Sequence, residues 1–155
     1  MRASFLTLTL IFGLTTNCFA LEPQQILELP SSEVEKALPS AHPMAYYVYS
    51  GRLAHEGDKE RALFWYYVGE LRYRFYLAVY PDLPPDGAPA LFGSLHQSAA
   101  QTIADPKVDK AMSITQCKRA LDWDATHENT VTSKKAHRKA WLNVRATLKD
   151  ELGVS

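Results

Sequence analysis

The sequence predicts an all-α domain, and three observations support this fold class. The segment from Asp58 to Tyr80 is rich in aromatic residues and contains neither proline nor a strong turn. As a single β-strand these 23 residues would extend about 75 Å, too far for a domain of this size. Elsewhere, apolar residues recur at helical spacing, and serine, threonine and aspartate stand where they can cap helices. We therefore expect five or six helices in one domain spanning residues 32–155.

The N-terminal part of this domain is expected to contain short elements. Residues 21–31 should form an irregular arm that lies on the domain through Ile26 and Leu29. Ser32 and Glu35 match a capping box, in which each side chain accepts a hydrogen bond from the backbone of the other residue. A short helix should begin there.

A longer helix should run from Met44 to the turn HEGD at residues 55–58. Gly57 supplies the left-handed conformation that commonly closes a helix, and Asp58 can cap the helix that follows.

The aromatic segment is expected to form the central helix of the domain, at about residues 58–80. With about 100° per residue, its apolar side chains divide into two opposite faces, and a helix with two apolar faces packs between neighbours. One face holds Ala62, Trp65, Tyr66, Gly69, Tyr73, Tyr76 and Tyr80, and the other holds Phe64, Tyr67, Val68, Leu71, Phe75 and Ala78. The alternative is a β-hairpin turning at Gly69 and Glu70, because many residues here favour strands.

The C-terminal half begins with a rigid connection, PDLPPDGAP at residues 81–89, which could serve as a recognition loop. A third long helix should follow. Its apolar stripe is Leu91, Phe92, Leu95, Ala99 and Ile103. Asp105 and Pro106 should begin a fourth helix, and Thr132 should cap the last one.

Composition and charge exclude some classes of protein. The 155 residues are 46% hydrophobic and 22% charged, as in an ordinary globular domain. The 17 basic and 17 acidic residues balance, so the chain lacks the positive field that attracts nucleic acid. We expect no nucleic-acid partner.

Residues 1–20 resemble a secretory signal peptide in their pattern: a basic start, an apolar run at Phe5–Leu14 and a small residue at Ala20. The run is too short to cross a bilayer as a helix. Cys18 raises lipid attachment as an alternative, although the residues before it do not match the usual lipoprotein pattern. We expect cleavage after Ala20 and export to the periplasm without stable membrane insertion, which leaves Cys117 as the one cysteine of the mature protein.

Two resemblances are found, one for residues 43–67 and a broader one for the whole mature chain. The segment PMAYYVYSGRLAHEGDKERALFWYY, residues 43–67, resembles one helix-turn-helix unit of the tetratricopeptide class. Gly51 is the small residue of its first helix, and Ala62 lies in its second helix. More broadly, the motifs HP, FWYY and LRYR are similar to those of a group of small exported proteins of Gram-negative bacteria. These resemblances imply a helical module that binds another protein.

Several polar residues are candidates for a binding site. His42 stands at a helix start, where it could hold a carboxylate or phosphate together with Arg72 or Arg74. The alternative is a capping or surface role. Arginines within an apolar helix need partners. We therefore expect ion pairs between the basic residues Arg61, Arg72 and Arg74 and the acidic residues Glu56, Glu60 and Glu70.

The sequence contains no pattern for catalysis, and we expect no catalytic residue, metal or cofactor. The segment LDWDATHENT at residues 121–130 gathers carboxylates and a histidine without the spacing of a known zinc or calcium motif. The basic stretch KKAHRK at residues 134–139 should be a solvated face of the last helix.

The function expected from these features is binding of another protein, as a periplasmic adaptor or as an immunity protein that blocks a toxin. The rival is a small-molecule receptor or enzyme with a pocket between the first two long helices. That pocket would be lined by Tyr46, Tyr47, Trp65, Glu70 and Arg72. A concave pocket with converging Arg, Glu and Tyr groups would favour the rival, and a flat tyrosine-rich patch would favour a protein partner. A structural envelope component would have neither.

Overall fold

The computed structural model describes residues 21–154, and within this range the protein is entirely helical with no β-strand. The predicted signal peptide and Cys18 lie outside the described residues. The helices are α1 (Pro23–Glu28), α2 (Ser31–Ala37), α3 (Met44–His55), α4 (Lys59–Val79), α5 (Ala88–Ile103), α6 (Lys110–Thr126) and α7 (Arg138–Leu152), with a 3₁₀ turn at Leu38–Ser40 after α2. The all-α class is thus confirmed, and the described residues form seven helices where five or six were expected.

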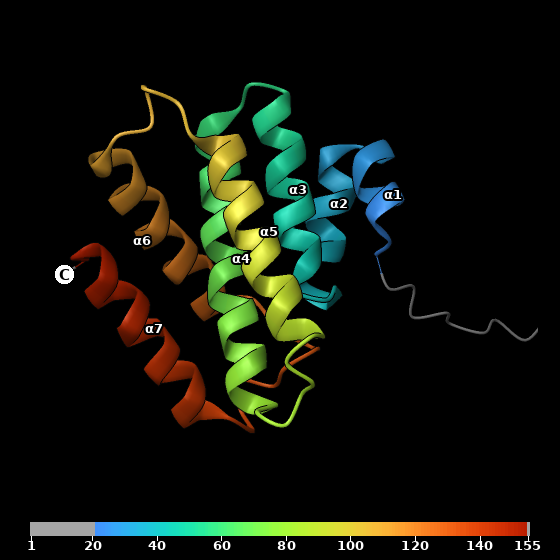
Figure 1. Ribbon diagram of the computed structural model, residues 1–155, viewed down its shortest axis with the longest axis vertical. Coiled ribbons are helices and arrows are strands. Elements are labelled where there is room, and N and C mark those ends of the chain that lie inside the picture. Colours follow the sequence, from blue (N-terminus) through green and yellow to red (C-terminus); the bar gives the residue numbers. More distant parts are fainter. Residues whose placement is uncertain (1–20, 155) are drawn as a thin grey trace, which may run out of the picture.

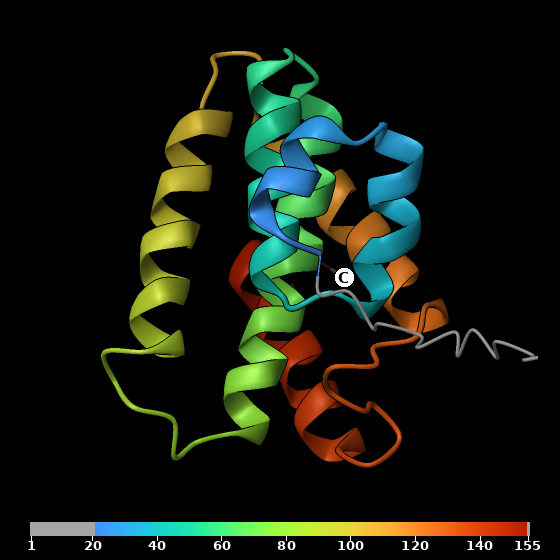
Figure 2. The ribbon, with the colours of Figure 1, turned by 90° about the vertical axis from the view of Figure 1, so that its right-hand side faces the viewer.

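Helix α4 lies at the centre of the domain (Figures 1 and 2). Helices α3 and α5 pack against α4 and against each other, and α1 packs on α3. Helices α6 and α7 pack on α4 from the side opposite α3 (Figure 1). Two groups of helices therefore share α4 as their common element.

The aromatic segment forms one continuous helix, so the hairpin alternative is wrong. Both predicted faces of α4 are buried from Ala62 to Phe75, because the helix has neighbours on several sides. Toward its end α4 emerges from the core: Ala78 is exposed and Tyr80 is 42% exposed. The helix begins as expected, with the Arg61 backbone N–H donating to Asp58 Oδ1 at 3.1 Å and Gly57 in the left-handed region at φ 88°.

The expected arm at residues 21–31 is helical instead of irregular. Glu22 precedes α1, and its backbone N–H donates to Gln25 Oε1 at 3.0 Å, which stabilises the first turn. Ile26 is fully buried, so α1 is anchored in the core. This extra helix accounts for the larger number of elements.

The capping box predicted at Ser32 is wrong, because α2 begins at Ser31 and its N-cap is Pro30, two residues before Ser32. The Glu35 carboxylate has other partners. It accepts a hydrogen bond from the Tyr49 hydroxyl at 2.9 Å and forms an ion pair with Arg61 at 2.5 Å. The Glu35 carboxylate that the capping box would have needed thus binds side chains of α3 and α4 instead.

Two helix starts in the C-terminal half are also displaced. Helix α6 is capped by Asp109, whose Oδ1 accepts from the Met112 backbone N–H at 2.8 Å, and not by Asp105. Helix α7 begins at Arg138 and not after Thr132. Thr132 is fully buried in the loop at residues 127–137, where its backbone N–H donates to Asn129 Oδ1 at 3.0 Å.

The absence of a side chain at Gly69 lets α4 pack closely against α3. A Cβ atom added there would lie 2.9 Å from Tyr46 Cβ, whereas one added at Gly51 would meet no atom within 4 Å. The glycine that allows this contact is therefore Gly69, on the second helix of the pair.

A membrane-crossing helix requires a long apolar stretch. No helix among residues 21–154 combines the length and apolar character needed for this.

Candidate functional site

The residues predicted to form a binding site lie in three separate places. Tyr46, Trp65 and Arg72 are in the core, with exposed fractions between 0 and 4%. Tyr47, Glu70 and Arg74 lie on the other side of α4, toward α5 and α7. His42 stands alone before α3, so no single pocket between α3 and α4 brings all seven together.

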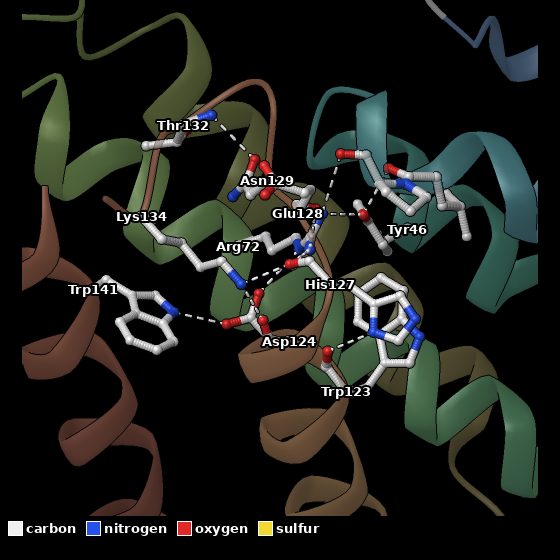
Figure 3. A network of polar contacts seen from close by, with 12 residues as sticks. Tyr46, Arg72, Trp123, Asp124, His127, Glu128, Asn129, Thr132, Lys134 and Trp141 are labelled. Carbon is white, nitrogen blue, oxygen red and sulfur yellow. Dashed lines mark hydrogen bonds and ion pairs between the residues drawn. The ribbon is translucent and has the colours of Figure 1, made fainter. Parts of the chain in front are cut away.

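Arg72 is the centre of a buried polar network (Figure 3). Its Nε lies 3.1 Å from Asp124 Oδ1, and the two side chains are only 1% and 2% exposed. Its terminal nitrogens donate to the Tyr46 hydroxyl at 2.7 Å and to the Glu128 carbonyl at 2.8 Å. The expected pairing of Arg72 with Glu56, Glu60 or Glu70 is wrong, because the partner is an aspartate from α6.

Aromatic rings and further donors complete this network. The Arg72 guanidinium lies 4.9 Å from the centre of the Trp123 ring, which favours a cation there. The second oxygen of Asp124 accepts from Trp141 Nε1 at 2.7 Å and lies 3.5 Å from Arg145. Since Arg72 is buried and engaged on all sides, its role is to join α3, α4, α6 and the following loop.

His42 also has a structural role. Its Nδ1 accepts from the Met44 backbone N–H at 3.2 Å, and its ring packs edge-on against Tyr73 and Tyr76. Burial lowers the pKa of His42, so the ring is neutral at pH 7 and offers no charge to an anion.

A groove on α4 is a concave site outside this network. It consists of two adjoining cavities of about 230 and 170 Å³ that share Tyr66 and Tyr67. The first is also lined by Glu70, Arg74, His96, Leu148, Glu151 and Leu152, and the second by Leu63, Ala100, Ile103, Ala104 and Val108. We call it the α4–α5–α7 groove, after the helices that supply most of its residues.

The groove exists because of how the helices share α4. Helix α5 rests on α3 and α4, whereas α7 rests on α4 and α6. The α4 surface between these two walls forms the floor. The tyrosines at positions 66 and 67 lie on this floor and connect its polar and apolar ends.

The polar end of the groove contains converging ionisable groups. Arg74 lies 2.5 Å from Glu70 and 2.7 Å from Glu151, so one cation is shared by two carboxylates. The Tyr66 hydroxyl lies 3.0 Å from His96 Nε2. Because Glu70 is 4% exposed, burial raises its pKa to about 7 despite the nearby arginine. Burial lowers the pKa of His96.

This pKa predicts a pH-dependent stability that Glu70→Gln removes. The folded-state pKa is about 7 and the ordinary value is 4.5, so between these values the folded protein holds a proton that the unfolded chain has lost. The free energy of unfolding of the wild type should therefore fall, relative to Glu70→Gln, by about 3 kcal/mol as pH rises through this window. Urea denaturation of the two proteins at several pH values measures the difference.

Glu60→Gln, at an exposed position on the same helix, is the matched control for that comparison. A difference between wild type and Glu70→Gln that stays constant over the window would show that the Glu70 carboxyl titrates normally.

Two residues of these sites were missed by sequence reasoning, and the position of a third was not predicted. His96 follows Leu95 of the predicted α5 stripe, and its place one helical turn after Phe92 was the available signal. Glu151 lies near the C-terminal end of α7 and gave no local signal. Asp124 was identified as part of an acidic cluster, although its side chain points into the core.

Comparison with known protein families, curated proteins and solved structures gives no match for this chain. Within residues 21–154, no group of three or more histidine, cysteine, aspartate and glutamate residues is placed to hold a metal ion. The geometry of the groove and of the other surface features is therefore the basis for a proposed function.

Proposed function

We propose that this protein is an exported helical binding domain whose α4–α5–α7 groove takes a small amphipathic molecule. The observation that carries the proposal is the division of the groove: Glu70, Arg74 and His96 converge at one end, and Ile103 and Val108 line the other. A flat apolar body and a polar head group would complement these two ends. Export is proposed from the signal-peptide pattern in the sequence.

The position of the tyrosines favours a small molecule over a broad protein interface. Tyr46, Tyr47, Tyr49 and Tyr73 are at most 2% exposed and contribute to the core. Tyrosines that anchor a partner must be accessible at the surface. The groove also meets the criterion of converging Arg, Glu and Tyr groups, although it lies on α4 between α5 and α7 and not between α3 and α4.

The proposal is tested with three probes that share a phenyl ring and differ in head group: phenethylamine, hydrocinnamate and hydrocinnamyl alcohol. Amide NMR should show binding of at least one probe with a Kd of about 1 mM, typical of a weak fragment. The shifted resonances should be those of groove residues such as Tyr67 and Ala100.

A blocking variant tests whether binding occurs in the groove. Ala100 is exposed on α5 and lines the apolar end, so Ala100→Trp should fill this end and weaken binding about tenfold. Ala90→Trp places the same ring at an exposed position near the start of α5 and should leave binding unchanged. Equal affinity of both variants, or no binding of any probe, would contradict the proposal.

A protein partner is the second candidate function, favoured by two exposed apolar residues beside the 81–89 connection. Tyr80 is 42% exposed and Leu91 is 39% exposed. The resemblance of residues 43–67 to a tetratricopeptide unit supports the same function, as an adaptor or immunity protein. A partner of this surface should bind the wild type and lose affinity for the double variant Tyr80→Ser/Leu91→Ser, measured with the purified pair.

A further inference from the structure

A second concave site lies between the end of α6 and the beginning of α7. Its cavity of about 460 Å³ is larger than either half of the groove. The lining residues are Ala125, Thr126, His127, Glu128, Asn129, Ser133, Lys134, Lys135, Arg138 and Trp141. Figure 3 shows part of this region, with Lys134 of the loop near Trp141 of α7 and Asn129 of the same loop near Thr132.

The cavity carries an excess of positive charge. Lys134, Lys135 and Arg138 line it, against the single carboxylate of Glu128. Lys134 Nζ donates to the carbonyls of His127 and Asp124, which carry no full charge to neutralise it. Among the ion pairs of residues 21–154, none involves Lys135 or Arg138.

The groups beneath the cavity do not offset this excess. Asp124 is already shared by Arg72 at 3.1 Å and Arg145 at 3.5 Å. The chain as a whole has 17 basic and 17 acidic residues, so this charge is a local feature. A concave surface lined by one sign of charge attracts the opposite sign.

The first turn of α7 adds backbone donors. The helix begins at Arg138 and His137 gives no side-chain cap. The turn before it is closed by Ser133, which accepts from the backbone N–H groups of Ala136 and His137. The Trp141 N–H donates to the His137 carbonyl. The N–H groups of the helix start that precede Trp141 lack an acceptor within the helix, and the positive end of the helix dipole lies here. An anion is the natural partner for such a helix end.

Asn129 adds a buried polar group without a full set of partners to this lining. The residue lines the cavity and is 5% exposed. Its Oδ1 accepts from the Thr132 backbone N–H, which fixes the orientation of the amide. Its Nδ2 is then a buried donor with no partner among the described residues. An acceptor oxygen within the cavity would satisfy it.

We propose that this cavity binds the phosphate group of a small phosphorylated molecule. Arg138 and Lys135 supply the charge, and the first turn of α7 and Asn129 supply hydrogen-bond donors. The volume exceeds what a phosphate group alone fills, so the ligand is a phosphate ester with an organic part. The site is separate from the α4–α5–α7 groove, and the proposal does not depend on the function of that groove.

Calorimetric titration at constant ionic strength tests this site with inorganic phosphate, glycerol phosphate and acetate as probes. Glycerol phosphate should bind with a Kd of about 1 mM, more tightly than inorganic phosphate and far more tightly than acetate. Arg138→Gln should weaken binding about tenfold, because it removes a cation from a concave site. Glu128→Gln should strengthen binding, because it removes the one carboxylate of the lining.

Lys107→Gln, an exposed position on the loop before α6, is the matched control and should leave binding unchanged. Circular dichroism checks that each variant is folded. Absence of binding by both phosphate probes would overturn the proposal, and so would equal effects of Arg138→Gln and Lys107→Gln. Acetate binding as tight as that of glycerol phosphate would overturn the assignment to phosphate.

Discussion

Replacing Arg72 with methionine is expected to lower the free energy of unfolding by about 3 to 5 kcal/mol, because it leaves a buried carboxylate without its partner. Asp124 is 2% exposed and would keep only Trp141 and the more distant Arg145. The Tyr46 hydroxyl and the Glu128 carbonyl would also lose their donor. Urea denaturation followed by tryptophan fluorescence measures the loss.

The double variant Arg72→Met/Asp124→Leu separates a lost ion pair from lost packing. If the uncompensated charge dominates, the second substitution should restore much of the stability. Arg119→Met removes an ion pair with Glu60 in which both side chains are more than half exposed, and it should cost less than about 1 kcal/mol. An equally small loss for Arg72→Met would show that the buried pair contributes little.

The second large effect is expected at Gly69, where alanine should lower the free energy of unfolding by about 1 to 3 kcal/mol through overpacking. The added Cβ would lie 2.9 Å from Tyr46 Cβ and 3.5 Å from the Tyr47 ring. Because Tyr46 Cβ is next to the backbone, α3 and α4 would have to move apart.

Gly51→Ala provides the matched comparison within the same helix pair. Its Cβ would meet no atom within 4 Å, so only helix propensity should act, raising the free energy of unfolding by about 0.5 to 1 kcal/mol. Thermal denaturation of the two variants should therefore give shifts of opposite sign. Shifts of the same sign would mean that Gly69 does not set the spacing of α3 and α4.

The features that could be predicted from sequence are those determined by local length and spacing. The central helix was predictable because 23 residues without a turn are too long for a strand, and because Asp58 and Gly57 mark its start. Helix starts were less predictable. Asp105 and Asp109 are both suitable caps by residue type, but Asp105 accepts from the Lys107 N–H in the preceding turn and Asp109 caps the helix.

The candidate sites depend on contacts between distant parts of the chain, which local patterns do not contain. Arg72 pairs with an aspartate 52 residues later, and Arg74 reaches a glutamate 77 residues later. The three glutamates that are closer in sequence each pair with another arginine: Glu56 with Arg52, Glu60 with Arg119 and Glu70 with Arg74. The groove is likewise a consequence of where α5 and α7 pack on α4.

The hydrogen bonds from Arg72 to two carbonyls of the 127–137 loop make this loop unfold cooperatively with the core. His127 and Glu128 belong to the 127–137 loop, yet both accept hydrogen bonds from a side chain in the centre of the domain. This segment is therefore fastened to the interior and opens together with it, in contrast to a surface loop that frays independently. The loop is ordered before a ligand binds. The entropy cost of ordering it is therefore part of folding and not of binding.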